Sequence, residues 1–408
     1  MRLWVVSELY YPEQTSTGYF MTELAEGLAA SRDVRVICSQ PTYSARGTLA
    51  PATEVRNGVR IERCAGTRFD KDRLALRIVN LLTISLSIAW TTWKRVRRGD
   101  LVLVVTNPPS LPFVVFLAAR LRRARSALRI EDVYPNVLVA AGMARPRSLL
   151  VRAIERATRA LYRQMECVVV LGRDMAALAA EKLGDRAARM IYIPNWGDTE
   201  SVRPMPRAEN ALLRELGIEH RFVVQYMGNM GRTHGVDALA SAALRLRNRA
   251  DLHFLFVGWG ARKTALEETV RKERLGRVTV LPGCSPADLP SYANACDLSV
   301  IAFQPGMAGV SVPSRMYNVM AAGKPILAVA DPESELARVV LEQSIGWVVP
   351  PDDLDALVAG IERAAATPAP ILAAMQQRAR QFVVSHHSKA RVVEQYVALM
   401  GALEANGA

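Results

Sequence analysis

The sequence alternates short runs of valine, isoleucine and leucine with segments of helical periodicity along its whole length. Runs that are apolar on both faces are typical of parallel strands buried between two layers of helices. We expect strands at 3–8, 34–38, 101–106, 127–132, 167–171 and 190–194, and again at 221–228, 252–258, 278–283, 298–303, 325–330 and 346–350. This pattern predicts doubly wound α/β structure, in which helices cover both faces of a parallel sheet.

The strand pattern occurs twice, and a chain of 408 residues is long enough for two full cores. Between the two sets lies a polar, proline-rich stretch, 194–210, which predicts a linker. We place an N-terminal Rossmann-like domain at 1–198 and a C-terminal one at 199–387. Parallel sheets bind ligands at the carboxyl ends of their strands, so we expect the functional site in a cleft between the domains.

All the excess positive charge lies in the first half of the chain. The formal net charge is +13; residues 1–195 hold 30 Lys and Arg against 17 Asp and Glu, whereas residues 196–408 hold 22 of each. A one-sided field of this kind predicts an anionic partner for the first half, either nucleic acid or an anionic membrane surface. No nucleic-acid-binding motif or interleaving of aromatic and basic residues is present, which favours the membrane.

One segment of the first half predicts how a membrane would be met. Residues 78–93 carry no charge, but the run is short and interrupted by polar residues, so it favours a helix lying in the interface over a membrane span. The alternative is a buried core helix beside a solvated basic face. The residues expected to contact the membrane are Trp90, Trp93, Arg95, Arg97 and Arg98.

Metal chemistry is not favoured by the spacing of ligand-type residues. The histidines and the five cysteines show no zinc-ligand spacing, and the scarce cysteines with no secretory signal predict a reduced, cytoplasmic protein. The triplets Asp70-Lys71-Asp72 and Asp353-Leu354-Asp355 follow no apolar strand, so we interpret both as solvated polar positions. We therefore expect no metal and no bound cofactor.

Glycine and cationic residues follow the first strand of the second half. Gly228, Gly231 and Gly235 would let a backbone approach a ligand closely, and Arg232 and His234 would supply cationic or hydrogen-bond donor groups. The spacing is not that of a dinucleotide fingerprint. The alternative interpretation is a glycine-rich turn with an exposed arginine.

Two further strand ends carry similar signals. Gly258 lies in a glycine turn after the next strand, and the stretch "GVSVPSRMYNVMAAGKPIL" at 309–327 predicts a loop, a short helix and a strand. Its helix opens with Pro313, Ser314 and Arg315 and has no acidic residue, although helix starts favour negative charge. Loop amides, Ser314 and Arg315 would together hold a diphosphate without a metal. The alternative is an ordinary capped helix.

The helix after the first strand of the chain begins near Thr17 and Gly18, preceded by Thr15 and Ser16. Free amides and hydroxyls at a helix start suit a phosphate or a sugar hydroxyl. An ordinary N-cap accounts for the same residues equally well.

In this order, several segments resemble glycosyltransferase family four, in particular its branch that builds bacterial exopolysaccharide and O-antigen. The segments are "PEQTSTGYFMTELAEGLA", "VVLGRDM", "IPNWGD", "YMGNMGRTHGVDAL", "VGWG", "ACDLSVIAF" and "PSRMYNVMAAGKPIL". The resemblance implies the GT-B fold, with the acceptor on the first domain, a nucleotide-sugar on the second and no metal. It also implies a C-terminal helix, about 388–408, that packs back on the first domain.

The resemblance implies roles for individual positions, with departures from the family's pattern. Two glutamates seven residues apart in the family fall on Val310 and Asn318, so Asn318 would contact the ribose as a neutral partner. The family's diphosphate-binding Arg and Lys fall on Asn229 and His234, and Arg232 would replace one of these charges. In the first domain, similar enzymes carry a histidine where this chain has Glu131, Asp132 and Tyr134. We expect Asp132 and Glu131 in the catalytic site and Thr17, Gly18, Tyr19 and Tyr134 at the acceptor.

These observations predict a retaining glycosyltransferase that works at the inner face of the plasma membrane. It would move a hexose or N-acetylated aminosugar from a UDP-linked donor to a lipid-linked saccharide. One alternative is a nucleotide-sugar epimerase on a similar scaffold, which would turn over its donor without an acceptor. The other is a non-catalytic GT-B scaffold subunit, because the two customary acids are absent.

Overall fold

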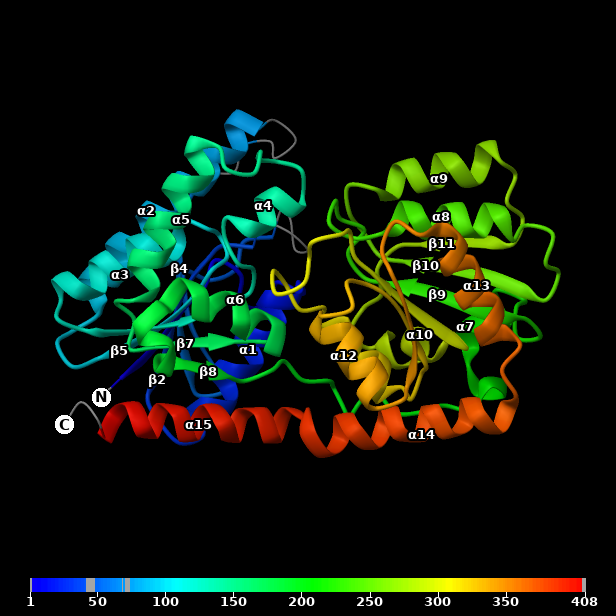
Figure 1. Ribbon diagram of the computed structural model, residues 1–408. Coiled ribbons are helices and arrows are strands. Elements are labelled where there is room, and N and C mark those ends of the chain that lie inside the picture. Colours follow the sequence, from blue (N-terminus) through cyan, green and yellow to red (C-terminus); the bar gives the residue numbers. More distant parts are fainter. Residues whose placement is uncertain (1, 42–47, 68, 70–73, 406–408) are drawn as a thin grey trace. The chain divides into compact units, whose positions relative to one another are not determined.

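The structure is a computed structural model that describes residues 2–41, 48–67, 69 and 74–405. The chain divides into two compact units. Unit 1 consists of Met1–Pro135, Pro146–Pro194 and Val393–Ala408, and unit 2 of Asn136–Arg145 and Asn195–Val392. Each unit is built on a parallel sheet with helices on both faces, which confirms the predicted α/β class (Figure 1). Asp70 and Asp72 lie outside the described residues.

Unit 1 holds an eight-stranded sheet within the described residues, with the strand order β3-β4-β2-β1-β5-β6-β7-β8. Its strands are β1 (Leu3–Val6), β2 (Val34–Ser39), β3 (Thr53–Arg56), β4 (Val59–Cys64), β5 (Leu101–Val105), β6 (Arg125–Arg129), β7 (Cys167–Val170) and β8 (Met190–Tyr192). All pairs are parallel except β3 with β4. The strands of the centre are fully buried, as the continuous apolar runs predicted.

The antiparallel pair β3–β4 was not predicted. Its two strands meet at Asn57 and Gly58, both of which have positive φ angles, 46° and 81°. An Asn-Gly pair between two strands is a strong signal for a two-residue hairpin, because only such residues adopt these angles cheaply. The hairpin therefore has a local signal in its turn residues, although its strands are not the continuous apolar runs by which the other strands are predicted.

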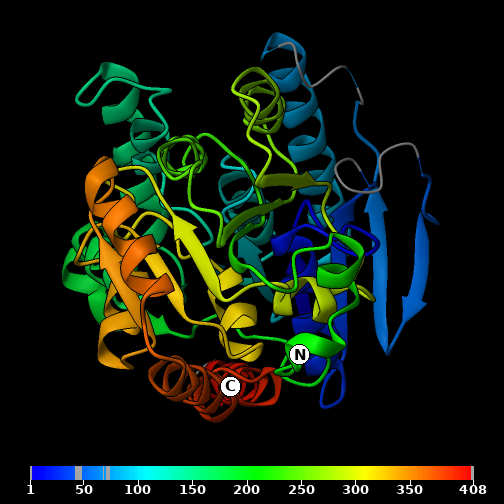
Figure 2. The same ribbon diagram turned by 90° about the vertical axis from the view of Figure 1, so that its right-hand side faces the viewer.

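Helices cover both faces of the sheet in unit 1. The helices α2, α3 and α5 lie on one side and α15 lies on the other (Figure 1; Figure 2 shows the same from the side). Val393 of α15 packs against Gly27 of α1, 3.0 Å from the position that a Cβ there would take. The helices are α1 (Ser16–Ala29), α2 (Leu74–Arg95), α3 (Leu111–Leu121), α5 (Leu149–Tyr162), α6 (Arg173–Leu183), η1 (Gly184–Arg189) and α15 (Lys389–Ala405), the last of which belongs to unit 1 from Val393 onward.

Unit 2 holds a six-stranded sheet within its described residues, in the order β11-β10-β9-β12-β13-β14, and all neighbouring strands are parallel. The strands are β9 (Phe222–Met227), β10 (Leu252–Val257), β11 (Val278–Leu281), β12 (Leu298–Ala302), β13 (Ile326–Val329) and β14 (Gly346–Val349). The order reverses at β9, where β10 lies on one side and β12 on the other. Ligands of open parallel sheets bind at such a reversal point.

Alternate side chains of β9 enter the two cores of unit 2. Val224 and Tyr226 pack in the larger core with α8 and α13, whereas Val223 packs in the smaller core with α7. The helices of the unit are α4 (Asn136–Ala140), η2 (Arg207–Glu209), α7 (Ala211–Glu215), α8 (Val236–Arg245), α9 (Lys263–Lys272), α10 (Leu289–Asn294), α11 (Arg315–Ala321), α12 (Glu335–Glu342), α13 (Leu354–Ala365) and α14 (Ala369–His386). Because both faces of β9 are buried, its carboxyl end is held rigidly where the predicted donor residues begin.

Candidate functional site

The carboxyl ends of β9 and β10 turn through glycines that lie against each other. Gly258 has φ +147°, and a Cβ there would lie 1.9 Å from the Gly228 carbonyl oxygen. Gly260 has φ +143°, and its Cβ would lie 2.5 Å from the Met230 carbonyl. The amide of Met230 donates to the Trp259 carbonyl at 2.7 Å. The two turns thus form one interlocked backbone layer that only glycine permits at these positions.

Arg315 begins α11 and reaches back to the end of β9. Its guanidinium carbon lies 4.5 Å from the centre of the Tyr226 ring, and Nη2 donates to the Ala302 carbonyl at 3.4 Å. A Cβ at Gly228 would lie 3.1 Å from Nη1. Nη1 is buried and has no hydrogen-bond acceptor among the described residues. A buried cationic donor that lacks an acceptor is costly, so this position favours an anionic ligand.

His234 lies beside Arg315 but carries no charge of its own at neutral pH. Burial, and secondly the Arg315 guanidinium, lower the pKa of His234 from 6.5 to about 3. Its Nδ1 lies 3.2 Å from the Thr233 hydroxyl oxygen, and its ring is 5.6 Å from that of Phe303. Of the two roles expected for this residue, the structure leaves the neutral one, as a hydrogen-bonding imidazole.

The other residues of the β9 turn differ in exposure. Arg232 is exposed, at the outer side of the turn. The backbone carbonyl of Asn229 accepts from the Tyr226 hydroxyl at 2.6 Å, and the Asn229 side-chain nitrogen lies 3.2 Å from the Cβ position of Gly231. Arg315 therefore contacts the start of this turn at Gly228 and Asn229 contacts it at Gly231, while Arg232 faces solvent.

Several backbone amides in the segment before α11 already donate hydrogen bonds within the protein. The amides of Gly306, Met307 and Ala308 all donate to Oδ2 of Asp331, at 3.0, 3.1 and 3.2 Å. The amide of Val310 donates to the Met307 carbonyl at 3.0 Å. The Val310 amide, which belongs to the loop 309–313 that we expect to offer amides to a diphosphate, is thus bonded within the protein. Gly306, Met307 and Ala308 precede that loop, and Asp331 fixes the backbone there.

The two positions where the family carries glutamate, Val310 and Asn318, have different surroundings in the structure. The Val310 side chain is 3% exposed and offers no polar group. The Asn318 side-chain oxygen accepts from the amide of Asp198 at 2.8 Å, which holds α11 against the segment after β8. Pro313 is buried, and Ser314 immediately precedes α11. Asn318 thus has a structural partner, with its side-chain NH₂ as the remaining donor.

In unit 1, the start of α1 uses most of its polar groups internally. The Thr15 hydroxyl accepts from the Gly18 amide at 3.3 Å, and a Cβ at Gly18 would lie 2.7 Å from the Glu13 carbonyl. Thr17 is buried, and the Tyr19 ring lies edge-on to Phe20 at 5.2 Å. The N-cap interpretation therefore holds for Gly18, whose amide is already engaged.

The loop after β6 carries the two carboxylates expected in the catalytic site, and the structure distinguishes them. Glu131 forms an ion pair with the fully buried Arg129 at 2.7 Å, and Nη1 of Arg129 donates to the Tyr396 hydroxyl on α15 at 3.1 Å. The Thr106 hydroxyl oxygen accepts from the amides of Glu131 and Asp132, at 2.9 and 3.2 Å. Glu131 is therefore held as part of the scaffold, whereas Asp132 and Tyr134 stand half-buried on the same loop.

The helix α2 presents a row of large apolar side chains to solvent. Trp90 and Trp93 stack with ring centres 5.0 Å apart, Lys94 Nζ lies 4.7 Å from the Trp90 ring, and the Arg122 guanidinium lies 5.7 Å from the Trp93 ring. Arg97 and Arg98 are exposed, and Arg95 pairs with Glu62 at 2.8 Å. The apolar side chains are Ile78, Val79, Leu82, Leu86, Trp90 and Trp93, each 38–63% exposed. The alternative of a buried core helix is therefore wrong for this face of α2.

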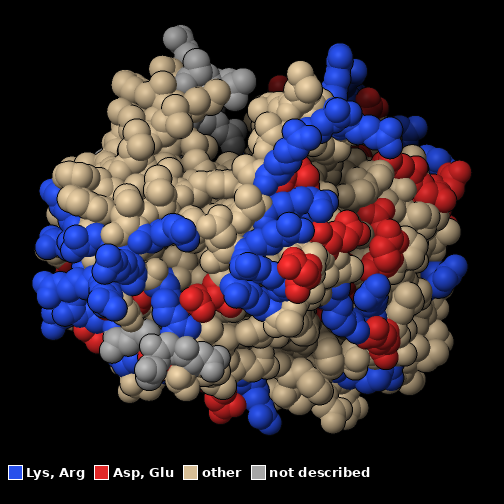
Figure 3. Space-filling view, turned by 60° about the vertical axis from the view of Figure 1, so that its left-hand side comes forward, with Lys and Arg blue, Asp and Glu red and all other residues tan. Residues whose placement is uncertain are grey.

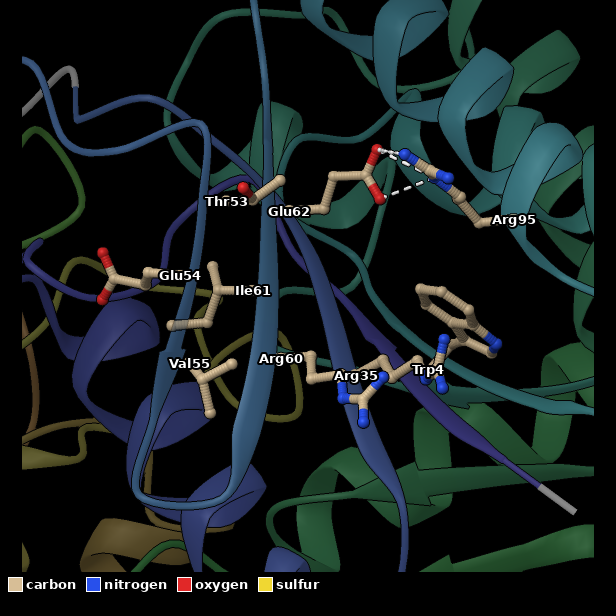
Figure 4. Close-up of a pocket in the computed structure, with 9 residues that line it drawn as sticks. All are labelled: Trp4, Arg35, Thr53, Glu54, Val55, Arg60, Ile61, Glu62 and Arg95. Carbon is tan, nitrogen blue, oxygen red and sulfur yellow. Dashed lines mark hydrogen bonds and ion pairs between the residues drawn. The ribbon is translucent and has the colours of Figure 1, made fainter.

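A pocket of about 400 Å³ lies on unit 1, near the amino ends of β1, β2 and β4 (Figure 4). Arg35, Arg60 and Arg95 line it together with Trp4 and Glu62. Arg95 is paired with Glu62, and Arg35 is paired with Asp33 at 3.1 Å. Because two of its cations are neutralised in place and it lies away from the carboxyl ends of the strands, the pocket is not the candidate site.

In the part of the chain that the structure describes, no three histidine, cysteine, aspartate or glutamate side chains are placed to hold a metal ion. Asp353 caps α13 by accepting from the Ala356 amide at 2.8 Å, and Asp355 pairs with Arg245 on the surface. None of the described helices is long and apolar enough to cross a membrane.

Comparison with known proteins places the two halves of the chain in related families. Residues 17–196 match the family model described as "Glycosyl transferase 4-like domain", and residues 221–367 match "Glycosyl transferases group 1". The chain is 30% identical over 358 residues to the probable glycosyltransferase WbjE of Pseudomonas aeruginosa, covering 87% of each chain. It is 27% identical to the putative colanic acid biosynthesis glycosyl transferase WcaI of Escherichia coli K12, covering 90% of this chain and 93% of the relative.

Solved structures share the fold of the whole chain. HepE of Anabaena, solved in complex with UDP-glucose, superposes with a TM-score of 0.76 at 15% identity and covers 98% of this chain and 100% of its own. At this level of identity the likeness shows the GT-B fold, as predicted, and nothing about the ligand of the present chain.

Proposed function

This chain belongs to glycosyltransferase family four, and on that premise we propose that it moves a hexose or N-acetylated aminosugar from a UDP-linked donor to a lipid-linked saccharide in bacterial cell-surface polysaccharide synthesis. The observation that carries the proposal is Arg315, whose Nη1 is buried without an acceptor where two glycine turns meet. The name of WcaI refers to colanic acid biosynthesis, and HepE was solved with UDP-glucose. These names describe the two related proteins, and they support a UDP-linked donor and a polysaccharide product in the present proposal.

The donor diphosphate would lie between Arg315 and the glycine turns. One guanidinium contributes the positive charge, because His234 is neutral and Arg232 is exposed. A fixed cation and oriented amides stabilise the negative charge that develops on the leaving diphosphate during sugar transfer. The buried guanidinium would supply this stabilisation in a site of low dielectric, where it is worth more than in water.

Asp132 is the residue we propose at the acceptor. Glu131 on the same loop pairs with Arg129, and Asp132, which is half-buried, is the carboxylate that we propose to bind an acceptor hydroxyl or to take its proton. No carboxylate side chain stands at position 310 to hold donor-sugar hydroxyls, since Val310 is buried there.

We propose that the configuration at the transferred sugar is retained, which an NMR assignment of the product's anomeric centre would test.

A single assay tests the transferase. The purified protein is incubated with a panel of nucleotide-sugars and lipid-linked saccharides, and products are detected by mass. We expect an acceptor lengthened by one sugar, with a UDP-linked donor and with loss of product in Asp132→Asn. Isomerised donor formed without acceptor would instead identify an epimerase. Neither product nor donor binding would identify a scaffold subunit.

Metal independence follows from the same arrangement, because Arg315 would already neutralise charge on the diphosphate. Transfer should continue in excess chelator. If turnover is lost on chelation and returns with magnesium or manganese, the proposed electrostatic role of Arg315 is insufficient and a metal must share it.

We also propose that unit 1 docks on the inner face of the plasma membrane through α2 and its neighbours. On α3, Leu117 and Leu121 are 57% and 66% exposed, and on α5 Leu149 is 82% exposed. Figure 3, which brings this side forward, shows Lys and Arg gathered beside a broad area free of charged side chains. An apolar ridge flanked by cations is the form of an interfacial helix, with basic residues contributing about 1 kcal/mol each near an anionic surface.

Flotation with liposomes tests this docking. Binding should require anionic lipid, weaken with salt, and weaken further in Trp90→Ala and in the pair Arg97→Glu, Arg98→Glu. Arg245→Glu, an exposed arginine of unit 2, is the matched control and should float normally. If the intact protein stays off anionic liposomes at low salt, the docking proposal fails and a soluble acceptor becomes the better candidate.

A further inference from the structure

Trp259 is the large aromatic side chain at the carboxyl end of β10, and 48% of it is exposed. It follows Gly258 and precedes Gly260, the two glycines whose turn interlocks with that of β9. Its backbone carbonyl accepts from the Met230 amide, so the main chain at this residue is part of the same layer that meets Arg315. An exposed indole is common, but one held on a rigid turn at the ligand edge of a sheet has a defined position.

The position of the indole ring is secured by a missing side chain on the neighbouring strand. β10 and β11 pair in register, Val257 with Leu281, which brings Trp259 beside Gly283. A Cβ at Gly283 would lie 1.9 Å from Cζ3 and 2.1 Å from Cε3 of the indole. The six-membered ring therefore occupies the space that any other residue at position 283 would need. The φ angle of Gly283 is not in the left-handed region, so the backbone conformation does not require glycine there. Glycine is needed at this position because a side chain would displace the indole ring.

The distance from this ring to Arg315 suits a nucleotide. Arg315 lies at the ends of β9 and β12, β10 is the next strand beyond β9, and β11 follows it. Neighbouring strands are about 4.8 Å apart, so the indole lies one to two strand spacings from the guanidinium along the ligand edge. A nucleoside diphosphate whose phosphates meet Arg315 could reach this ring with its base by crossing the turns at Gly228, Gly258 and Gly260, which themselves carry no side chains.

We propose that Trp259, seated on Gly283, is the aromatic surface against which the nucleobase of the donor stacks. This inference rests on the proposed function, because it requires a nucleotide-sugar at Arg315. Stacking on an aromatic face tolerates every base, so Trp259 contributes affinity, and the choice among nucleotides comes from other contacts. Trp259 is accordingly a binding residue that acts on the base and not on the diphosphate.

The test is calorimetric binding of UDP and of ribose 5-diphosphate, which lacks the base. We expect Trp259→Ala to weaken UDP by about tenfold or more, which is typical of one stacked base, and to leave ribose 5-diphosphate unchanged. Trp259→Phe keeps a stacking face and should retain most of the affinity. Gly283→Ala should reproduce the loss without altering the tryptophan, because its Cβ displaces the ring. Leu341→Ala, another exposed apolar residue of unit 2, is the control.

The possible outcomes distinguish a failure of the stacking role of Trp259 from a failure of the proposed donor site at Arg315. If UDP binds the native protein and Trp259→Ala binds it equally well, the stacking role is wrong while the donor site at Arg315 stands. If Trp259→Ala weakens UDP and ribose 5-diphosphate alike, the residue supports the site's structure and the base lies elsewhere. If the native protein binds no nucleotide, both proposals are overturned.

Discussion

Arg315 is the residue whose replacement most directly tests the donor site. Arg315→Met keeps an unbranched side chain against Tyr226 and removes the charge. If the guanidinium binds the diphosphate, the loss is that of a charge-assisted hydrogen bond, about 1.5–3 kcal/mol. At about 1.4 kcal/mol per factor of ten, the affinity for UDP should fall roughly ten- to hundredfold.

The stability of the ligand-free protein should change little in the same variant. Arg315→Met removes a long hydrogen bond to Ala302, 3.4 Å, and a cation–π contact worth about 0.5–2 kcal/mol. It also removes the buried Nη1 that lacks an acceptor, which relieves a cost of about 1–3 kcal/mol. The two effects oppose each other, so the unfolding temperature without ligand should stay within a few degrees of the native value, an interval typical of about 1 kcal/mol.

Two measurements are needed together. Calorimetry gives the affinity for UDP, and thermal unfolding with and without UDP gives the stabilisation by ligand, which grows with the ratio of ligand concentration to Kd. Arg245→Met is the control, because Arg245 pairs with Asp355 on the surface at 3.0 Å. Unchanged UDP affinity in a folded Arg315→Met protein would refute the assignment. A large fall in ligand-free stability would show that the guanidinium is structural.

Three further outcomes follow from individual contacts. Between pH 6.5 and about 3 the unfolded chain binds a proton at His234 that the folded protein does not, so the free energy of unfolding should fall as the pH drops through this window. Denaturant titrations should show a less steep fall in His234→Gln, and equal slopes in the two proteins would contradict the lowered pKa of His234. Glu131→Gln removes the carboxylate that pairs with the buried Arg129 and should lower stability in urea unfolding, by up to about 3–5 kcal/mol, whereas a cost near zero would free Glu131 for catalysis. Gly258→Ala should abolish UDP binding in calorimetry, because its Cβ would meet the Gly228 carbonyl at 1.9 Å; retained binding would mean that the turns separate easily.

Local patterns in the sequence were sufficient for the architecture. A strand buried on both faces must be apolar at every position, and this requirement is visible within a window of a few residues. The central strands of both sheets are accordingly where the apolar runs placed them, as at β5 and β10. The short hairpin at Asn57 and Gly58 has an equally local signal, which lies in its turn residues and not in an apolar run.

The candidate site was predicted as a set of strand ends but not as a set of contacts. The sequence placed Arg315, His234 and the glycine turns at the carboxyl ends of parallel strands, where side chains from distant segments must converge. It could not place the guanidinium over Tyr226, nor assign His234 its neutral form, because a pKa depends on burial and on charges brought near by folding.

Tertiary structure alone decided which polar groups remain available for a ligand. Asp331 takes three amides of a loop that lies more than twenty residues before it, and Arg129 takes Glu131 while reaching Tyr396 from the far end of the chain. The sequence near Asp331 and near Arg129 does not indicate the distant partners, because hydrogen bonds form with whatever the packed helices and strands bring within about 3 Å. The sequence therefore determined which chemistry the strand ends could offer. The packing determined that Arg315 offers it, because its Nη1 is buried without an acceptor among the described residues, whereas Glu131 is paired with Arg129.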